Sequence, residues 1–246
     1  MSALAVLLVA VGIGDLCRRL VDVRWLAPAV AVAAVAACSL LGALWHVGDV
    51  ILLVIAAAAS VAWLLLCGRA ERTGAHQALP LSVFGLAVIA LFLLSALGSD
   101  VSGTVAHWLD WMGYDISPNR TLMVVGVVLT QLATANELVR LVLGSVGSVR
   151  PAGVPQASDQ LKGGRLLGPM ERLLIVGLGL AGQLTMASAV VAAKSIIRVP
   201  EISANRDKNG NPKRVGIDDV TEYFLVGSFA SWILALGGLA LVAVVH

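Results

Sequence analysis

The chain has 246 residues, of which 59% are hydrophobic and only 13% are charged, and its formal net charge at pH 7 is +2. A water-soluble domain carries about 25% charged residues and about 45–50% apolar ones, so this composition excludes an ordinary soluble fold. No segment is basic and aromatic enough to predict a nucleic-acid-binding surface, and no P-loop or other cofactor-binding motif is present.

Apolar blocks follow one another along the chain, and most are close to the length of about 20 residues that a bilayer-crossing helix needs. The predicted helices are Ala3–Leu20, which is short for a full crossing, and Leu26–Leu44, Val50–Cys67, Leu81–Leu97, Leu122–Leu143, Leu173–Ala193 and Phe224–Val245. Helices satisfy all backbone polar groups within their own segment, as hydrocarbon requires. The sequence therefore predicts an all-α, polytopic transmembrane bundle of about seven helices in the lipid bilayer.

Polar connections divide this single predicted membrane domain into regions. Residues 1–143 form a five-helix N-terminal region, and residues 144–169 form a polar linker rich in Gly, Ser and Pro. Residues 170–246 form a two-helix C-terminal region with a charged loop at 199–218.

Connections that contain lysine or arginine alternate along the chain with connections that contain neither. They occur in Arg18–Arg24, Gly68–Ala78 and Gly144–Pro169, whereas His46–Asp49 and Gly98–Asn119 have none. Basic connections stay on the cytoplasmic side of a membrane. We therefore expect a multi-pass protein of the bacterial cytoplasmic membrane with its N-terminus outside and, after seven crossings, its C-terminus inside.

The sixth block breaks this alternation. If Leu173–Ala193 crosses once, the basic segment Arg198–Asp219 lies outside, against the charge rule. A re-entrant hairpin with its tip among Gly177, Gly179 and Gly182 would return that segment to the cytoplasm. We favour one continuous helix, because glycine is common in membrane helices and the apolar pattern runs on to Ile197.

Polar side chains inside apolar helices are costly and often mark function. One group, a secondary polar face, comprises Asp15 of the first helix and Gln131, Asn136, Glu137 and Arg140 of the fifth. Glu137 and Arg140 have the i,i+3 spacing of an ion pair. Both an interhelical hydrogen-bond seam and a ligand-facing surface fit this pattern.

The C-terminal region holds the second polar group. Lys194 and Arg198 share one helix face, and Glu222 opens the next helix, so these three are predicted to form one ion-pair cluster with Tyr223 beside it. The candidate ligand-binding residues are Glu171, Arg172, Gln183, Lys194, Arg198, Glu222 and Tyr223.

Three runs in this region, GRLLGPMER, AAKSIIR and TEYFLVGSFAS, carry a resemblance to a known family. They resemble a family of uncharacterised bacterial membrane proteins, domain of unknown function 3307, over roughly residues 164–236. The residues that match its motifs are Gly164, Gly168, Glu171, Arg172, Ala192, Ala193, Lys194, Ser195, Arg198, Glu222, Tyr223, Leu225, Gly227 and Ser231. The resemblance implies a polar site embedded in the membrane, but no reaction.

Three function classes remain open. The favoured class is a protein that binds or transports an anionic small molecule or lipid head group; the alternatives are a subunit packing against a partner membrane protein or a second copy, and an enzyme acting on lipid-linked substrates. The four histidines are scattered, and the three cysteines lack metal-ligand spacing. We therefore predict no metal, no cofactor and no catalytic residue, and an enzyme is disfavoured.

Overall fold

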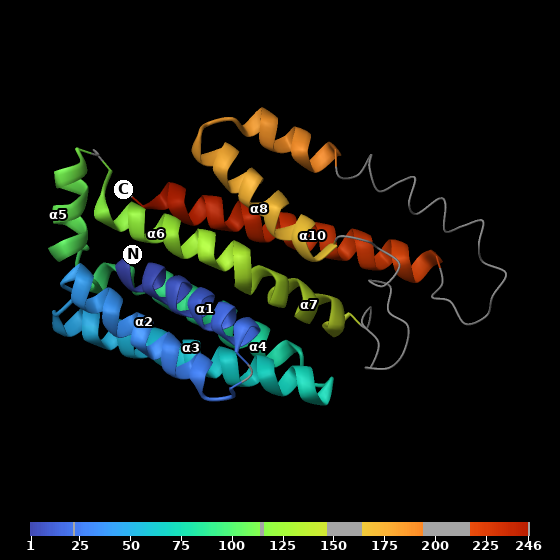
Figure 1. The fold of residues 1–246 in the computed structure, drawn as a ribbon, viewed down its shortest axis with the longest axis horizontal. Coiled ribbons are helices and arrows are strands. Elements are labelled where there is room, and N and C mark those ends of the chain that lie inside the picture. Colours follow the sequence, from blue (N-terminus) through green and yellow to red (C-terminus); the bar gives the residue numbers. More distant parts are fainter. Residues whose placement is uncertain (22, 114–115, 147–163, 194–216, 246) are drawn as a thin grey trace. The chain divides into compact units, whose positions relative to one another are not determined.

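The computed structural model describes residues 1–21, 23–113, 116–146, 164–193 and 217–245, and all regular structure in these ranges is helical (Figure 1). The predicted all-α class is therefore confirmed. The elements are α1 (Ser2–Leu20), α2 (Leu26–Gly42), α3 (Val47–Thr73), α4 (Ala78–Leu93), the 3-10 helix η1 (Ser95–Leu97), α5 (Gly103–Met112), α6 (Pro118–Leu129), the π-helix η2 (Thr130–Thr134), α7 (Ala135–Ser145), α8 (Gly164–Leu180), the helix Leu184–Ala193 and α10 (Ile217–Val244).

Within the described ranges, three helices are long and apolar enough to cross a bilayer. They are Val47–Thr73, Thr221–Val244 and Pro118–Ser145, the last of which runs without interruption through α6, η2 and α7. The apolar helices Leu26–Gly42 and Ala78–Leu93 are shorter. The three long helices support a transmembrane protein, whereas a bundle of about seven crossings goes beyond what these lengths establish.

The chain divides into two compact units. The N-terminal unit comprises Met1–Thr134 together with Ala240–His246, and the C-terminal unit comprises Ala135–Leu239. One boundary therefore falls inside the helix Pro118–Ser145, directly after η2, and the other falls inside α10.

In the N-terminal unit, α1 is the central helix, and α2, α3, α6 and η2 pack around it. Almost every residue from Ser2 to Val11 is buried. Small residues allow this close packing, because a Cβ on Gly12 would lie 2.7 Å from the Leu129 Cβ, and one on Gly126 would lie 2.9 Å from the Ala5 carbonyl oxygen. The apolar block that is short for a crossing is thus the core of its unit.

Adding one methyl group to Gly12 is expected to force α1 and α6 apart. Gly12→Ala should lower the free energy of unfolding by about 1–3 kcal/mol, the usual cost of overpacking. Gly85→Ala on α4 is the matched control, since nothing lies within 4 Å of the added Cβ. Thermal unfolding of both variants in detergent measures the difference, and equal stability would contradict this packing.

One end of the N-terminal unit gathers the first residues of α1 and α3 with the connection after α4. The buried Asp49 carboxylate accepts hydrogen bonds from the Ser99 amide (2.7 Å) and hydroxyl (2.5 Å), and the Ser2 hydroxyl donates to the Ser99 carbonyl (2.9 Å). At the other end, Arg18 of α1 pairs with Glu71 of α3. In this unit Asp49 and Ser99, at the connections without lysine or arginine, therefore lie at the end opposite Arg18 and Glu71, at the basic connections, in agreement with the alternation of charge.

The helix α5 was not predicted, because the segment Gly98–Asn119 has no long apolar run. It begins after Ser102 and ends at Gly113, whose φ of 72° suits glycine. Its contacts are mainly with α2.

In the C-terminal unit, the predicted continuous helix Leu173–Ala193 is wrong. Helix α8 ends at Leu180, and Gly182 adopts a φ of 73°, which L-residues with side chains rarely adopt. The amides of Gln183 and Gly182 donate to the carbonyls of Leu178 (2.8 Å) and Gly179 (3.1 Å), the pattern of a Schellman motif that closes a helix. The chain then reverses into Leu184–Ala193, as Figure 1 shows.

Helix α8 runs parallel to α10 and antiparallel to α7. Glu171 contacts Trp232, and further along both helices a Cβ on Gly179 would meet the Leu239 side chain. Because α8 and α10 begin at the same end of the unit, the chain between Leu180 and Ile217 must return to that end. The hairpin alternative required such a reversal near Gly182.

Candidate functional site

The C-terminal unit holds a group of buried polar side chains from three helices, which we call the Arg172 cluster: Asn136 of α7, Glu171 and Arg172 of α8, and Ser231 and Trp232 of α10. Arg172 is only 2% exposed. Its guanidinium donates hydrogen bonds to the Ser231 hydroxyl (3.0 Å) and to the Asn136 side-chain carbonyl (2.5 Å). One arginine thereby connects α7, α8 and α10.

Glu171 lies beside Arg172 in sequence and is 6% exposed. Its carboxylate accepts a hydrogen bond of 2.7 Å from the indole nitrogen of Trp232. A buried indole N–H needs such an acceptor, and a buried carboxylate needs donors. The cluster therefore contains two adjacent ionisable residues whose side chains reach different partners on α10.

The position of the Arg172 cluster along the candidate membrane span follows from its contacts with α10. Ser231 is ten residues after Thr221 and thirteen before Val244, the bounds of the candidate span. At 1.5 Å of rise per residue, this position lies about 15 Å from one end of the helix and about 20 Å from the other. The guanidinium that contacts Ser231 therefore lies near the middle of the span.

Glycines let the helices approach at the Arg172 cluster. A Cβ on Gly168 would lie 3.4 Å from a guanidinium nitrogen of Arg172 and 3.7 Å from the Asn136 side-chain oxygen. A Cβ on Gly227 of α10 would lie 3.5 Å from the Leu143 side chain of α7. A large side chain at Gly168 would displace the polar groups, and one at Gly227 would displace Leu143.

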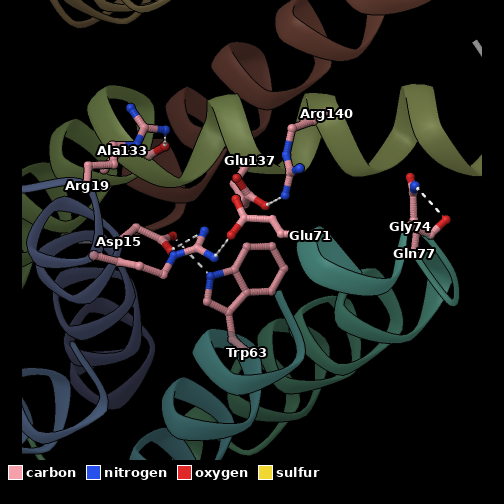
Figure 2. Close-up of polar contacts among 10 residues, drawn as sticks. Asp15, Arg19, Trp63, Glu71, Gly74, Gln77, Ala133, Glu137 and Arg140 are labelled. Carbon is pink, nitrogen blue, oxygen red and sulfur yellow. Dashed lines mark hydrogen bonds and ion pairs between the residues drawn. The ribbon is translucent and has the colours of Figure 1, made fainter. Parts of the chain in front are cut away.

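The N-terminal unit has its own buried polar group, the Asp15 cluster: Asp15 and Arg18 of α1 with Trp63 and Glu71 of α3 (Figure 2). Asp15 is 1% exposed and accepts a hydrogen bond of 3.0 Å from the Trp63 indole nitrogen. Arg18 lies 3.6 Å from the Asp15 carboxylate and 3.0 Å from that of Glu71. The polar contacts thus continue from the buried Asp15 to the half-exposed Glu71.

The π-helix η2 adds a further polar contact to this unit. The Arg19 guanidinium donates to the Ala133 carbonyl oxygen at 2.6 Å, as drawn in Figure 2. Gln131 and Thr134 are buried on the same π-helical turn, and the Thr134 hydroxyl has no hydrogen-bond partner in the described part of the chain. π-Helical turns inside α-helices occur frequently at functional sites.

The structure divides the predicted secondary polar face between the two units. Asp15 and Gln131 belong to the N-terminal unit, whereas Asn136, Glu137 and Arg140 belong to the C-terminal unit. The predicted pair between Glu137 and Arg140 is present (Figure 2).

The candidate ligand-binding residues separate in a similar way. Glu171 and Arg172 belong to the Arg172 cluster, but Gln183 is exposed at the turn after α8, about three helical turns further along the chain. Glu222 is exposed and Tyr223 half-buried near the start of α10. Lys194 and Arg198 lie outside the described residues, so their predicted cluster with Glu222 stays a prediction.

The tryptophan partners were missed by sequence reasoning. Trp63 and Trp232 lie inside apolar blocks, whereas Trp45, Trp108 and Trp111 fit an interfacial belt. A buried tryptophan needs an acceptor for its N–H group, and Asp15 and Glu171 are among the few carboxylates in or beside the apolar blocks. That requirement was the signal which could have predicted both contacts.

The fold and these buried polar groups describe an all-helical membrane protein with a polar cluster in each of its two units. Among the described residues, no group of three or more His, Cys, Asp or Glu side chains could hold a metal ion. No family model, curated protein or solved structure matches the chain.

Proposed function

We propose that this chain is a polytopic protein of the bacterial inner membrane that binds an anionic group, for retention or transport, at the Arg172 cluster. The buried guanidinium near the middle of a candidate span is the observation that carries the proposal. An arginine at mid-bilayer costs about 2.5–3.5 kcal/mol on insertion scales, and such residues usually serve function.

The contacts of Arg172 suit anion binding. Asn136 and Ser231 accept hydrogen bonds from the Arg172 guanidinium and so help to fix its orientation. Guanidinium groups bind phosphate and carboxylate through two parallel hydrogen bonds, which favours arginine at such sites. The shared ligand chemistry is an oxyanion, carried by a small molecule or by a lipid head group.

The proposal is tested on the full chain with two probes, phosphatidylglycerol and inorganic phosphate. Native mass spectrometry counts the phosphatidylglycerol retained against phosphatidylcholine, and a thermal shift reports phosphate binding. Arg172→Gln should weaken binding on the order of tenfold, because a hydrogen bond to a charged group contributes about 1.5–3 kcal/mol. Retention of the lipid alone indicates a head-group site, and a response to phosphate alone indicates a small-anion site.

Two variants control this experiment. Arg69→Gln removes an exposed arginine from α3 and should leave binding unchanged. Arg172→Lys keeps the charge and should bind better than Arg172→Gln, which separates anion binding from loss of the fold. Equal binding by wild type and a folded Arg172→Gln would refute the proposal.

The resemblance to domain of unknown function 3307 stays part of this proposal. It is supported by one contact between its motifs, since Arg172 of the first motif donates a hydrogen bond to Ser231 of the third. The lipid bilayer is the expected surrounding, and a partner membrane protein or a second copy remains an alternative role.

We also propose a revised membrane arrangement, with the N-terminus and the C-terminus both outside. The predicted inside C-terminus depended on a single crossing by Leu173–Ala193, which the turn at Gly182 interrupts. Because α8 and α10 are parallel, a cytoplasmic linker at 144–169 makes α10 begin inside and end outside. The basic segment Arg198–Asp219 then lies on the cytoplasmic side, as the charge rule expects, and Arg120 beside an outer connection is the departure from that rule.

A cysteine at Gln183 tests this arrangement. In a background without Cys17, Cys38 and Cys67, Gln183→Cys should react with an impermeant maleimide added outside spheroplasts, because it is exposed at a turn that faces outward. Arg69→Cys, in a basic connection, should react only after permeabilisation. Protection of Gln183→Cys until permeabilisation would place the turn in the cytoplasm and reject the arrangement.

A further inference from the structure

Within the N-terminal unit, the connection before α5, residues 98–102, is held where two candidate membrane spans begin. Helices α3 and α6 each open such a span. The Ser99 amide donates a hydrogen bond to Asp49, the third residue of α3 (2.7 Å). The Val101 amide donates to the side-chain oxygen of Asn119, the second residue of α6 (2.8 Å). The connection therefore lies at the level where both spans enter the bilayer.

Helix α5 follows this connection directly. The Ser102 amide donates to the carbonyl of Gly42, the last residue of α2, so α5 begins beside the end of α2 (3.0 Å). Its ten residues extend about 15 Å, half of the thickness of about 30 Å that a span must cross. Figure 1 shows α5 running across the direction of α2 and α6. Helix α5 is thus a short helix at the boundary of the bilayer.

Three different sides surround the axis of α5. Leu109 is 4% exposed and lies on the side that packs against the unit, mainly against α2. His107 and Asp110 are exposed about one turn apart and form a polar side. Trp108 and Trp111, which are 53% and 84% exposed, form an aromatic side. The indoles therefore point neither at the protein nor along the polar side.

The spacing of these three sides fits a helix at the bilayer surface. Successive residues of an α-helix are rotated by about 100°, which places the centres of the three sides about 100–130° apart. A helix that lies where protein, lipid and water meet needs one side for each of them. Indoles prefer the head-group region, where the ring is in an apolar environment and the N–H group can bond.

The charges near α5 favour apolar rather than electrostatic contact with lipid. No lysine or arginine occurs in Gly98–Asn119, which contains three aspartates. Amphipathic helices that bind anionic membranes by charge carry lysine and arginine on their polar face. Contact between α5 and lipid would therefore depend on the tryptophans and not on anionic head groups.

We infer that α5 is an interfacial helix that lies along the bilayer surface, with Trp108 and Trp111 in the lipid head-group region and Asp110 in water. Its partner is the lipid surface itself, whatever the charge of the head groups. Because residues 98–102 form hydrogen bonds with α1, α3 and α6, the two tryptophans would fix the depth of this end of the N-terminal unit in the membrane. The inference uses no residue of the Arg172 cluster and does not depend on anion binding.

Spin labels on the full chain in phosphatidylcholine nanodiscs test this inference, with the three native cysteines replaced. Thr104→Cys lies on the aromatic side, one turn before Trp108, and Asp110→Cys on the polar side is the matched control; both positions are exposed. Collisions with oxygen report contact with lipid, and collisions with a water-soluble nickel chelate report contact with water. The ratio of oxygen to nickel collisions should be several-fold higher at Thr104→Cys, because the apolar face of an interfacial helix is buried about 5–10 Å.

Replacing the tryptophans tests their role. Trp108→Gln combined with Trp111→Gln should abolish the difference between the two labels, with circular dichroism reporting the fold. Trp25→Gln is the control, since Trp25 is 74% exposed and precedes α2 at the end of that helix away from α5. Equal collision ratios at the two positions in the chain with all tryptophans would overturn the inference and indicate an aromatic side that faces water, as a docking surface for a protein would. A difference that persists in the folded double variant would also overturn it.

Lipid composition provides the last comparison. Adding phosphatidylglycerol to the nanodiscs, or raising the salt concentration, should leave the collision ratio at Thr104→Cys unchanged, because charge attraction is screened by salt and α5 has no basic residue. A ratio that rises with phosphatidylglycerol and falls with salt would contradict apolar anchoring by the two tryptophans.

Discussion

Replacing Arg172 with leucine is expected to lower the free energy of unfolding by about 3–5 kcal/mol, the cost of removing one partner from a buried charged network. Asn136 and Ser231 each lose the donor that now holds them, and α7, α8 and α10 lose their common contact. For a chain of this length the change corresponds to a fall in melting temperature of roughly 10 °C. Thermal unfolding in detergent measures it.

The matched control for this prediction is Arg69→Leu. Arg69 is exposed near the end of α3, so its removal should change stability by about 0.5 kcal/mol or less. The double variant Asn136→Leu, Arg172→Leu should lose less free energy of unfolding than the sum of the losses in the two single variants. Once one residue of the pair is replaced, the other has already lost this contact. Additive losses would show that the contact between Arg172 and Asn136 contributes nothing.

Asp15→Ala is expected to destabilise the N-terminal unit by about 2–4 kcal/mol, because the buried Trp63 indole would lose its acceptor and Arg18 would lose the buried one of its two carboxylate partners. Asp15→Asn should cost less, since the amide oxygen can still accept from the indole. Unfolding monitored by tryptophan fluorescence and by circular dichroism measures both variants.

A double-mutant cycle isolates the contact between Asp15 and Trp63. Trp63→Phe removes the donor and keeps most of the ring, which also contacts Phe84 at 5.1 Å between ring centroids. The two changes together should be coupled by about 1 kcal/mol, at the upper end of hydrogen bonds in membrane proteins. A coupling energy near zero would mean that the hydrogen bond contributes no stability.

Helix positions were largely predictable from the sequence, because a long uninterrupted apolar run in a membrane protein can form few structures other than a helix. The predicted Leu26–Leu44 and Ala3–Leu20 agree with α2 and α1 within two residues at each end. The larger differences occur where polar residues extend a helix beyond the hydrocarbon. Helix α3 continues to Thr73, past the predicted end at Cys67, because Arg69, Glu71 and Arg72 are all good helix formers.

The break at Gly182 was not predictable from apolarity alone. Membrane helices tolerate glycine, so GLGLAGQ reads equally well as helix interior or as helix end. Whether the helix continues or ends here depends on whether Gly182 adopts a positive φ, and tertiary packing determines that angle. The break at Gly182 adds a reversal of the chain direction between α8 and the helix Leu184–Ala193.

The candidate site was predicted in part. Glu171 and Arg172 stood out as charged residues beside an apolar run, and they do form a buried cluster with α10. Their partners Ser231 and Trp232 depend on which turn of α10 faces α8, and hydrophobic periodicity carries little of that information in a helix apolar on all sides. The burial of α1 inside its unit was not predictable from the sequence either, because a helix surrounded by lipid and a helix surrounded by protein are both apolar.

The central position of α1 has a consequence for biosynthesis. Its neighbour α6 leaves the ribosome more than a hundred residues later, which is on the order of ten seconds at usual rates of translation. During that interval the α1 face that later contacts Gly126 and Leu129 lacks its native cover. Asp15 can meet Trp63 of α3 earlier, because α3 emerges before α6. We therefore expect the chain to be most vulnerable to membrane quality-control proteases before α6 is inserted.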